Sequence, residues 1–349
     1  MQFVLAKFLS KKIFMKILVT GGAGFIGSHT VVALVEAGFE PIIIDDFSNS
    51  QKGVLDGLKT ILGKPVKCYE ADCNNFETLK NILQTEEIKG VIHFAAFKAV
   101  GESVQNPLKY YENNIGSLVA LLKAMHTEGV KNVIFSSSAT VYGLLEELPA
   151  TEKTPIQEAM SPYGNTKQMG EEILRDVVAS GASVRGISLR YFNPIGAHPS
   201  ALIGELPLGV PNNLVPFITQ TAAGIREKLI VYGDDYITPD GTCLRDYIHV
   251  SDLADAHVAA LKMLFSLEKD NYYDIFNVAT GQPNSVLEVI TTFEEVSRQS
   301  LNYQIGARRA GDVPSLFADA SKIKTELGWT AKRSMRQALE DAWRWQQSL

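Results

Sequence analysis

The sequence predicts an α/β fold, a doubly wound parallel sheet with helices on both faces, joined to a smaller mixed α/β lobe. From Lys16 onward, short apolar runs alternate with longer helical patterns, which is typical of a parallel sheet covered by helices. After Arg190 the sequence becomes rich in Gly, Pro and Asn, and shorter helices and strands follow. The first pattern predicts the sheet, and the second predicts the smaller lobe.

The first half of the chain contains six runs that we expect to be buried strands. They cover residues 17–20, 41–44, 66–69, 90–94, 132–136 and 184–189. Helical patterns lie between them, notably at residues 25–37, 107–126 and 162–179. This order is what a dinucleotide-binding half requires. We therefore expect residues 15–193 to form a Rossmann-like domain.

The second half begins with an irregular stretch at residues 193–216, and such a long irregular stretch in a compact protein is usually functional. Further helices are expected at residues 214–225, 251–267 and 285–297, with strands at 229–232 and 273–278. We expect residues 194–349 to form mainly a ligand-binding lobe, with the segment around 246–280 returning to the first domain.

Composition and charge limit the possible partners. The chain has 349 residues, of which 46% are apolar, and a net charge of −6. Such a chain can bury a large core, but it has no basic field that would attract nucleic acid or anionic lipid. No apolar run reaches the roughly 18 residues of a membrane span. We expect neither a nucleic-acid nor a membrane partner.

The cysteines and the N-terminal residues are the features of the sequence that bear on the cellular compartment of the protein. Cys68, Cys73 and Cys243 form no close pair of the kind found in zinc or redox sites, so we expect reduced thiols, no metal and a cytoplasmic protein. Residues 1–14 mix apolar and lysine side chains and lack a small-residue cleavage site before Met15. They are interpreted as a dispensable extension or as the result of a start codon assigned too early.

A glycine-rich loop follows the first expected strand. It reads Gly21-Gly22-Ala23-Gly24-Phe25-Ile26-Gly27 and runs directly into a helix. The glycines permit a tight turn and a close approach of the backbone to pyrophosphate, and the helix N-terminus attracts the negative charge. The loop therefore predicts a dinucleotide site.

Asp45 ends the second expected strand, about 20 residues beyond the loop, where a carboxylate can accept hydrogen bonds from ribose hydroxyls. It would repel a 2′-phosphate, which favours NAD over NADP. The alternatives are that Asp45 caps the next turn, or that Asp46 takes its place.

Tyr163 and Lys167 lie four residues apart at the start of an expected helix, which places them on one face. A nearby cation favours the phenolate form of tyrosine. Lowering the phenol pKa from about 10 toward neutrality requires roughly 4 kcal/mol, which a lysine and an oxidised nicotinamide in a dry site can supply. The alternative is a surface helix pair.

Hydroxyl side chains follow the fifth expected strand, where ligands of parallel sheets bind. We expect Ser138 to hydrogen bond a substrate oxygen whose proton Tyr163 takes. Ser136 and Ser137 are interpreted as turn-capping hydroxyls.

These residues resemble the extended short-chain dehydrogenase/reductase superfamily, and within it the UDP-glucose 4-epimerase family. The resemblance runs from about Met15 to the C-terminal tryptophans. Its most specific stretches are HFAAFKAVGESVQNPLKYYENN from His93, FSSSATVYG from Phe135, SPYGNTK from Ser161, LRYFNPIGAHPS from Leu189, PNNL from Pro211 and DGTCLRDYIHVSDLADAH from Asp240. Related dehydratases carry an Asp-Glu pair where this chain has Ala139 and Thr140, which argues against dehydration.

The resemblance implies roles for individual residues. It implies that Ser138, Tyr163 and Lys167 are catalytic, and that Gly21, Gly24, Phe25, Ile26, Gly27, Asp45, Asp72, Phe94, Lys98, Asn113, Tyr163, Lys167 and Phe192 contact NAD. It implies that Ser138, Asn193, Asn213, Leu214, Arg245, Arg309, Asp312 and Leu316 contact the UDP sugar. Core packing is the alternative for Phe94 and Phe192, and a surface ion pair is the alternative for an isolated arginine.

The implied reaction is the reversible C4 epimerisation of UDP-glucose and UDP-galactose through a 4-keto sugar, in galactose metabolism. Leu316 falls at the family's selectivity position, where tyrosine accompanies plain hexoses and a small residue accompanies N-acetyl sugars. Leucine at this position predicts weak activity on UDP-N-acetylhexosamines. The alternative is that Leu316 only packs against neighbouring residues and does not set the selectivity. The resemblance also implies a homodimer formed through helices 107–126 and 162–179.

Two other functions remain open. One is epimerisation of another nucleotide sugar, such as a UDP-N-acetylhexosamine, a UDP-pentose or a uronic acid. The other is a relative that senses NAD(H) without chemistry, which would normally lack Tyr163 or Lys167; both are present.

Overall fold

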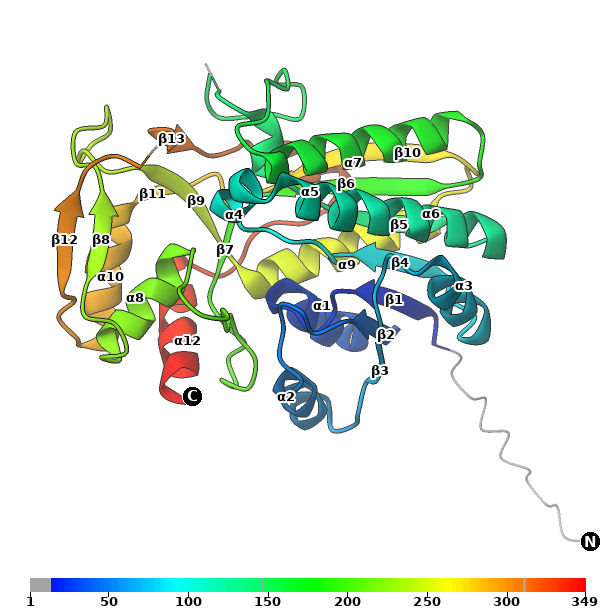
Figure 1. Ribbon diagram of the computed structural model, residues 1–349, viewed down its shortest axis with the longest axis horizontal. Helices are drawn as coiled ribbons and strands as arrows, with labels where there is room; N and C mark the ends of the chain where they lie inside the picture. The colour runs from blue at the N-terminus through cyan, green and yellow to red at the C-terminus, as the bar shows by residue number, and fades with distance from the viewer. Residues whose placement is uncertain (1–13, 146, 310–311) are drawn as a thin grey trace, which may run out of the picture.

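A computed structural model describes residues 14–145, 147–309 and 312–349. The expected extension at residues 1–14 lies outside the described residues except for Phe14. The chain forms a seven-stranded parallel sheet with helices on both faces and a smaller lobe beyond the sheet's carboxyl edge (Figure 1). The predicted fold class is confirmed.

The sheet has the strand order β10-β6-β5-β4-β1-β2-β3, and every neighbouring pair is parallel. The first six strands lie where the apolar runs predicted them. Their bounds are β1 Lys16–Thr20, β2 Glu40–Asp45, β3 Lys67–Glu70, β4 Gly90–His93, β5 Asn132–Ser138 and β6 Arg185–Tyr191. The seventh strand, β10 (Tyr272–Val278), comes from the second half of the chain and pairs with β6.

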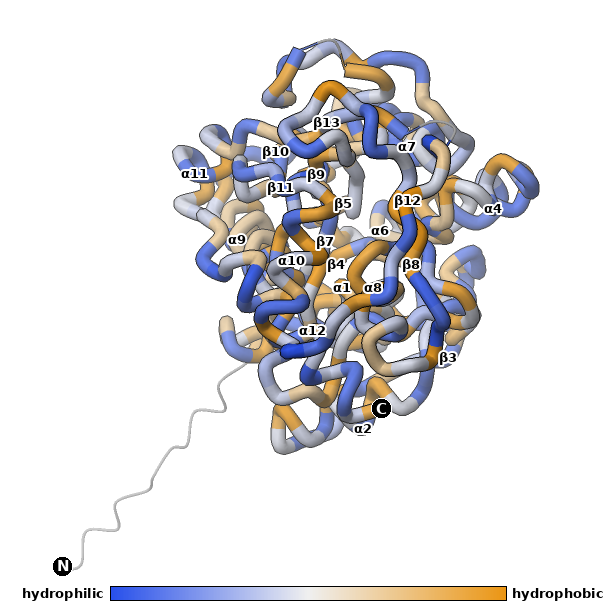
Figure 2. Tube along the Cα trace, turned by 90° about the vertical axis from the view of Figure 1, so that its left-hand side faces the viewer, coloured by the Kyte–Doolittle hydropathy of each residue, from blue (hydrophilic) through white to orange (hydrophobic). Residues whose placement is uncertain are grey.

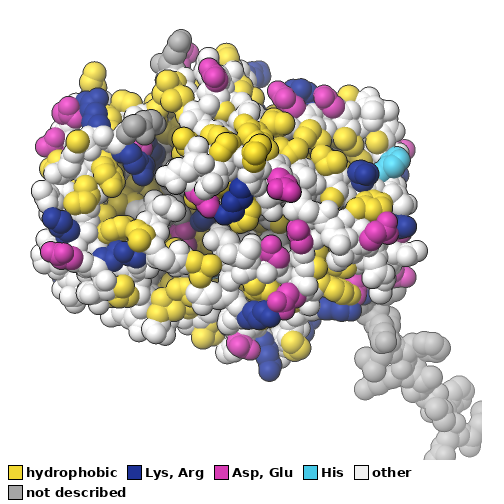
Figure 3. Space-filling model, viewed as in Figure 1, with side chains coloured by type: hydrophobic (Ala, Val, Ile, Leu, Met, Phe, Trp, Pro, Cys, Tyr) yellow, Lys and Arg dark blue, Asp and Glu magenta, His cyan; other side chains and the backbone are white. Residues whose placement is uncertain are grey.

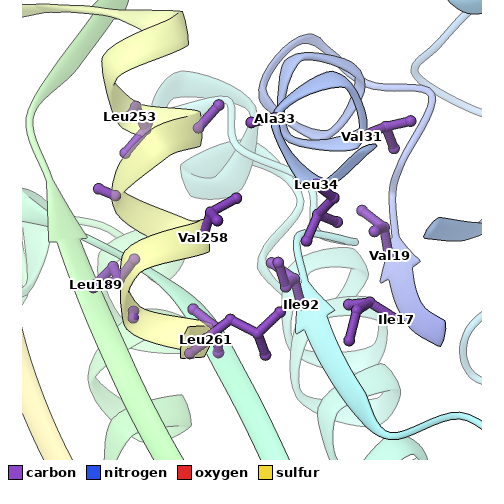
Figure 4. Close-up of a cluster of buried hydrophobic side chains, with 14 of the residues drawn as sticks. Ile17, Val19, Val31, Ala33, Leu34, Ile92, Leu189, Leu253, Val258 and Leu261 are labelled. Atoms are coloured by element: carbon purple, nitrogen blue, oxygen red, sulfur yellow. The ribbon is translucent and has the colours of Figure 1, made fainter. Parts of the chain in front are cut away.

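One face of the sheet is covered by α1 (Phe25–Glu36) and α9 (Val250–Ser266), and α2 (Gly53–Leu62) and α11 (Ser321–Leu327) contribute to the same core. Figure 4 shows Leu34 of α1 and Val258 and Leu261 of α9 converging near Ile92 of β4. All of these side chains are buried, and burying an aliphatic side chain contributes about 1.5–3 kcal/mol. This cluster fixes α1, and with it the glycine loop, against the sheet.

The other face is covered by α3 (Phe76–Thr85), α6 (Gly116–Glu128) and α7 (Pro162–Ala179). The helix expected at residues 107–126 is not continuous. It consists of α5 (Pro107–Tyr110), a π-helical segment (Tyr111–Ile115) and α6, and a short α4 (Val100–Gln105) precedes it. Such π segments are rare and often mark functional sites, and this one contains Asn113.

The smaller lobe has its own core, made by helices around short strands. Its helices are α8 (Leu214–Ala222), α10 (Val286–Ser297) and α12 (Met335–Gln347). Its strands are β7 (Asn193–Ile195), β8 (Leu229–Tyr232), β9 (Leu244–His249), β11 (Pro283–Ser285), β12 (Tyr303–Gly306) and β13 (Ser315–Leu316). The expected domain boundary between residues 193 and 194 falls inside β7, because the chain leaves the large sheet at Phe192. Figure 2 shows hydrophobic chain around β4, β5 and α1 and hydrophilic chain along α12.

No helix within the described residues is long and apolar enough to cross a membrane. In the same part of the chain, no group of three or more His, Cys, Asp or Glu side chains could hold a metal ion.

Candidate active site

The glycine loop connects β1 to α1 at the carboxyl edge of the sheet. Gly21 has φ +67°, and a Cβ there would lie 2.9 Å from the Ala95 nitrogen; a Cβ at Gly27 would lie 2.3 Å from the Gly21 oxygen. Only glycine fits these positions. Gly24 is the N-cap of α1 and supplies no side-chain cap, and the first turn contains no acidic residue. The helix therefore presents its positive end to a ligand, as pyrophosphate binding requires.

Asp45 is tied to the glycine loop. One carboxylate oxygen accepts the N–H of Ala23 at 3.0 Å, and the other accepts the Phe47 N–H at 3.0 Å and the Ser50 hydroxyl at 2.8 Å. Asp46 points elsewhere, to exposed Ser48. Burial raises the pKa of Asp45, although the three hydrogen bonds act in the opposite direction. The structure thus places Asp45, not Asp46, beside the loop, and the loop and carboxylate together fit NAD.

The start of α7 carries the tyrosine and the lysine. Ser161 caps the helix by accepting the Gly164 N–H at 3.1 Å, and Pro162 occupies the first turn, where its missing N–H is not needed. The cap directs Tyr163 and Lys167 toward the end of β5. Tyr163 is 9% exposed and Lys167 is 4% exposed, and the Lys167 ammonium donates to the Ser136 carbonyl at 2.7 Å. A surface helix pair is therefore excluded.

The titration of this pair is governed by burial. Burial raises the pKa of Tyr163, while a hydrogen bond with Ser138 and the positive charge of Lys98 lower it. Burial lowers the pKa of Lys167 to about 8, and the charge of Glu171 partly offsets that effect. Burial thus outweighs the neighbours that lower the pKa of the phenol, and any further positive charge beside it would favour the phenolate.

Glu171 and Arg190 form a buried ion pair beside the site, and neither residue was predicted from the sequence. The Glu171 carboxylate accepts from Arg190 Nε at 2.9 Å, from Arg190 Nη2 at 2.6 Å and from the Ser137 hydroxyl at 2.5 Å. Arg190 and Glu171 are both nearly inaccessible to solvent. Glu171 lies four residues after Lys167 on α7, and this spacing was the available signal. Ser137 is therefore part of a buried network, not a turn cap.

Asn114, next to the predicted Asn113, was also missed. Its side chain bonds both backbone groups of Phe97, at 2.9 and 3.0 Å, and donates to the Thr166 hydroxyl at 3.1 Å. It thereby links the loop after β4 to the turn of α7 that carries Lys167. Asn113 itself accepts from Asn74 at 3.3 Å.

The remaining residues expected at the NAD site lie along the same sheet edge. Phe94 contacts His257, with ring centres 4.7 Å apart, and Lys98 forms an ion pair with Glu205 at 3.0 Å. Phe192 is buried in the cluster that follows β5. Asp72 is exposed and caps its own turn by accepting the Asn74 N–H. Contacts with protein thus account for all four side chains, and their roles toward NAD stay predictions.

The smaller lobe gathers the residues expected to hold the UDP sugar. Asp312 contacts Arg309 through two hydrogen bonds of 2.8 and 3.1 Å and lies 3.7 Å from Arg245. Leu316 pairs in register with Arg245, and Asn193 with Tyr247, so β7 and β13 both pair with β9. Figure 3 shows the surface hollowed between this lobe and the sheet, with basic side chains in the hollow.

Asn213 and Leu214 are placed at the other wall of this region, at the start of α8. The structure therefore forms two groups, one of Ser138, Tyr163 and Lys167 at the sheet edge, and one of the two arginines with Asp312 on the lobe. Lys98 and Glu205 connect the sheet edge to the lobe.

A buried Ser–Tyr–Lys set beside a glycine-rich loop of a parallel sheet defines a short-chain dehydrogenase/reductase. The sequence profile of the GDP-mannose 4,6 dehydratase family matches residues 18–342. The UDP-glucose 4-epimerase of Bacillus subtilis is 51% identical over 96% of this chain and 97% of its own. The chain belongs to the UDP-glucose 4-epimerase family.

Solved structures agree with this assignment. The enzyme of Stenotrophomonas maltophila, with NAD and formylated UDP-arabinopyranose, superposes with a TM-score of 0.93 at 45% identity, over 96% of this chain and 98% of that one. The enzyme of Bifidobacterium longum, in complex with NAD+ and UDP, gives 0.91 at 46% identity over the same shares.

Proposed function

We propose that this protein is an NAD-dependent isomerase that interconverts UDP-glucose and UDP-galactose by inverting carbon 4 through a 4-keto sugar. The observation that carries the proposal is the burial of Tyr163 and Lys167 at the carboxyl end of β5, beside Ser138. The glycine loop lies at the same edge of the sheet, and Lys98 and Glu205 join this edge to the lobe that carries the arginines. A sugar attached to UDP can therefore reach the tyrosine.

The chain's own residues handle the proton. Held by the glycine loop and Asp45, NAD would supply the hydride acceptor for carbon 4 and the hydride donor for its return. Tyr163, as phenolate, removes the proton from the 4-hydroxyl, and Ser138 orients that hydroxyl. Lys167 supplies a positive charge that favours the phenolate. Burial of all three residues keeps water from the keto sugar.

Inversion requires the keto sugar to present its other face. Arg245 and Arg309 hold the pyrophosphate, since an arginine fork donates two parallel hydrogen bonds to such groups. The hexose must be held more loosely so that it can turn. Because NAD is regenerated in each cycle, no second substrate is needed, and we expect the cofactor to stay bound.

The roles of individual residues are part of this proposal. We assign Ser138, Tyr163 and Lys167 to catalysis, the glycine loop and Asp45 to the NAD phosphates and ribose, and Arg245, Arg309 and Asp312 to UDP. Asp72, Phe94, Lys98, Asn113 and Phe192 complete the NAD set, and Asn193, Asn213, Leu214 and Leu316 complete the substrate set.

The test is to incubate the purified protein with UDP-galactose, without added cofactor, and to follow UDP-glucose by chromatography. We expect UDP-glucose to form, with little product from UDP-N-acetylgalactosamine in parallel. No product from UDP-galactose even with added NAD, but turnover of another UDP sugar, would reassign the substrate. No turnover of any of them would favour a non-catalytic NAD sensor.

We infer that the protein is a homodimer in solution. Val104 of α4 and Leu108 of α5 are 61% and 79% exposed, and Val119 of α6 is 40% exposed. Figure 3 shows hydrophobic side chains gathered around α5 and the start of α7. Apolar patches of this kind mark interfaces.

Light scattering after size exclusion should give twice the mass of the chain. Leu108→Glu together with Val119→Glu should give the mass of one chain, whereas Ile225→Glu, which also replaces an exposed apolar side chain, should leave the dimer intact. A wild-type monomer overturns the inference.

We also infer that the enzyme serves galactose metabolism in the cytoplasm. Three free cysteines, of which Cys73 and Cys243 are buried, are consistent with a reducing compartment. Cell fractionation checks the location.

A further inference from the structure

One carboxylate oxygen connects the two halves of the site. Glu205 Oε1 accepts from the Lys98 ammonium at 3.0 Å and from the Asn213 side-chain amide at 2.6 Å. Lys98 lies in the loop after β4, at the sheet edge. Asn213 immediately precedes α8 in the smaller lobe. The Glu205 side chain is 11% exposed, whereas that of Lys98 is 49% exposed. The carboxylate is therefore much less exposed than the ammonium with which it pairs.

The backbone at Glu205 is held independently of its side chain. The indole N–H of Trp345, on α12, donates to the Glu205 carbonyl at 3.1 Å. A Cβ at Gly204 would lie only 2.4 Å from the Trp345 ring, so only glycine lets the indole approach this closely. The backbone that carries the Glu205 carboxylate is thus held in a fixed position in the lobe.

The Asn213 side chain contacts Glu205 and does not cap the helix that follows it. Asparagine is a favoured N-cap because its side-chain oxygen can accept an N–H of the first turn. At α8 no side-chain cap bond forms, and the Asn213 amide is directed to Glu205 instead. A residue that could have stabilised the helix therefore serves the connection between the lobe and the sheet.

Lys98, one end of the connection made by Glu205, is one of several titratable groups whose pKa values are coupled to Tyr163. Lys98 is the charged group that lowers the Tyr163 pKa, and Lys167 of α7 lies 5.9 Å from its ring centre. Burial chiefly raises the pKa of Tyr110 of α5 and of Tyr191 of β6, and the charge of Tyr163 acts in the same direction. Of these neighbours, Lys98 bonds to the smaller lobe, through Glu205.

We propose that Glu205 is a positioning residue that sets both the charge of Lys98 beside Tyr163 and the position of Asn213 at the substrate wall. The proposal rests on the epimerase function proposed above. It predicts that the two effects of Glu205 can be separated, because Glu205→Gln removes the charge but keeps an oxygen that Asn213 can reach, while Glu205→Ala removes both.

The first readout is the pH dependence of kcat/KM. Without the carboxylate, the charge of Lys98 is uncompensated and favours the Tyr163 phenolate, so the acid limb of Glu205→Gln should move to lower pH by about half a unit or more. Lys98→Met should move the limb to higher pH. Adding Glu205→Gln to Lys98→Met should move it by a smaller amount, because only the direct repulsion between the Glu205 carboxylate and the Tyr163 phenolate is then removed.

The second readout is UDP binding by calorimetry, which requires no turnover. Glu205→Ala should weaken UDP about tenfold, and Glu205→Gln should stay within about threefold of wild type. Asp270→Asn is the matched control, because Asp270 also bonds a lysine, Lys131, at 2.7 Å but is exposed and remote. It should change neither readout.

A limb that stays in place in Glu205→Gln, or a shift of the same size in the Lys98→Met background, overturns the charge effect through Lys98. Equal UDP affinities in wild type and Glu205→Ala overturn the positioning effect. If wild type fails to epimerise any sugar, the proposed function fails, while the calorimetry still decides whether Glu205 positions the substrate wall.

Discussion

The ammonium of Lys167 lies 5.9 Å from the centre of the Tyr163 ring, and its hydrogen bond goes to the Ser136 carbonyl. Lysine and tyrosine therefore interact through charge across a short gap. Because burial raises the pKa of Tyr163, the phenolate depends on the positive charges around it. This arrangement makes the chemistry sensitive to each charged neighbour.

Removing the phenol should abolish most of the activity. Tyr163→Phe keeps the ring but loses the base, and general bases contribute about 10²–10⁴-fold. We expect kcat to fall about a thousandfold in the epimerase assay, with the UDP affinity measured by calorimetry nearly unchanged. Tyr303→Phe, at an exposed position on β12, is the control. Unchanged turnover of Tyr163→Phe would remove Tyr163 as the base.

Activity should decline as the pH rises through about 8. Burial lowers the pKa of Lys167 to about 8, so its positive charge is lost at a pH where an exposed lysine is still protonated. The Tyr163 phenolate then loses a positive charge that stabilises it. We expect an alkaline limb in kcat/KM near pH 8, while Tm measured over the same range excludes unfolding as its cause.

Lys167→Arg tests the origin of that limb. Arginine stays protonated throughout the range, so the limb should disappear or move well above pH 9 even though the rate falls. An alkaline limb that stays near pH 8 in this variant would assign the titration to another group.

The sequence predicted the large sheet closely because each strand is a short apolar run bounded by polar turns. The run at residues 229–232 and the helix at 162–179 have the predicted bounds. The discontinuity in the helix expected at 107–126 was not predictable from periodicity, since a segment as short as Tyr111–Ile115 does not reveal by its pattern whether it is α-helical or π-helical. It depends on tertiary contacts, such as those of Asn114 with Phe97 and Thr166.

The site was predictable where motifs are local. The glycine loop and the Tyr163–Lys167 spacing are short-range patterns, and the structure places them at one sheet edge. Glu171–Arg190 and Lys98–Glu205 join residues separated by 19 and 107 positions. No local pattern identifies Arg190 or Glu205 as the partner in these pairs, because the pairing is set by how distant elements pack.

Replacing Asp45 should weaken NAD binding. Asp45→Asn keeps the shape but removes the charge beside the glycine loop, and hydrogen bonds to charged groups contribute about 1.5–3 kcal/mol. We expect the Kd for NAD to rise about ten- to a hundredfold, and less NAD to remain with the purified protein. Asp46→Asn, the adjacent control, should bind as wild type. The opposite ranking of the two variants would assign the ribose to Asp46.

The size of residue 316 should decide how well N-acetylhexosamines are accepted. Leu316 lies beside Arg245 in the pairing of β13 with β9 and packs against the cluster of Val141, Phe192 and Ala318. Its side chain therefore extends from Arg245 toward the segment that follows Ser138. Enlarging or reducing it changes the space available to a substituent on the sugar.

Leu316→Ala should raise the ratio of kcat/KM for UDP-N-acetylgalactosamine over UDP-galactose at least about tenfold, the scale of a few methylene groups in an apolar pocket. Leu316→Tyr should lower that ratio. Ile305→Ala, which shortens a side chain 40% exposed on β12, should leave it unchanged. If both Leu316 variants keep the wild-type ratio while the Tm of Leu316→Ala falls, Leu316 contributes packing alone, and the selectivity must lie in the neighbouring loop.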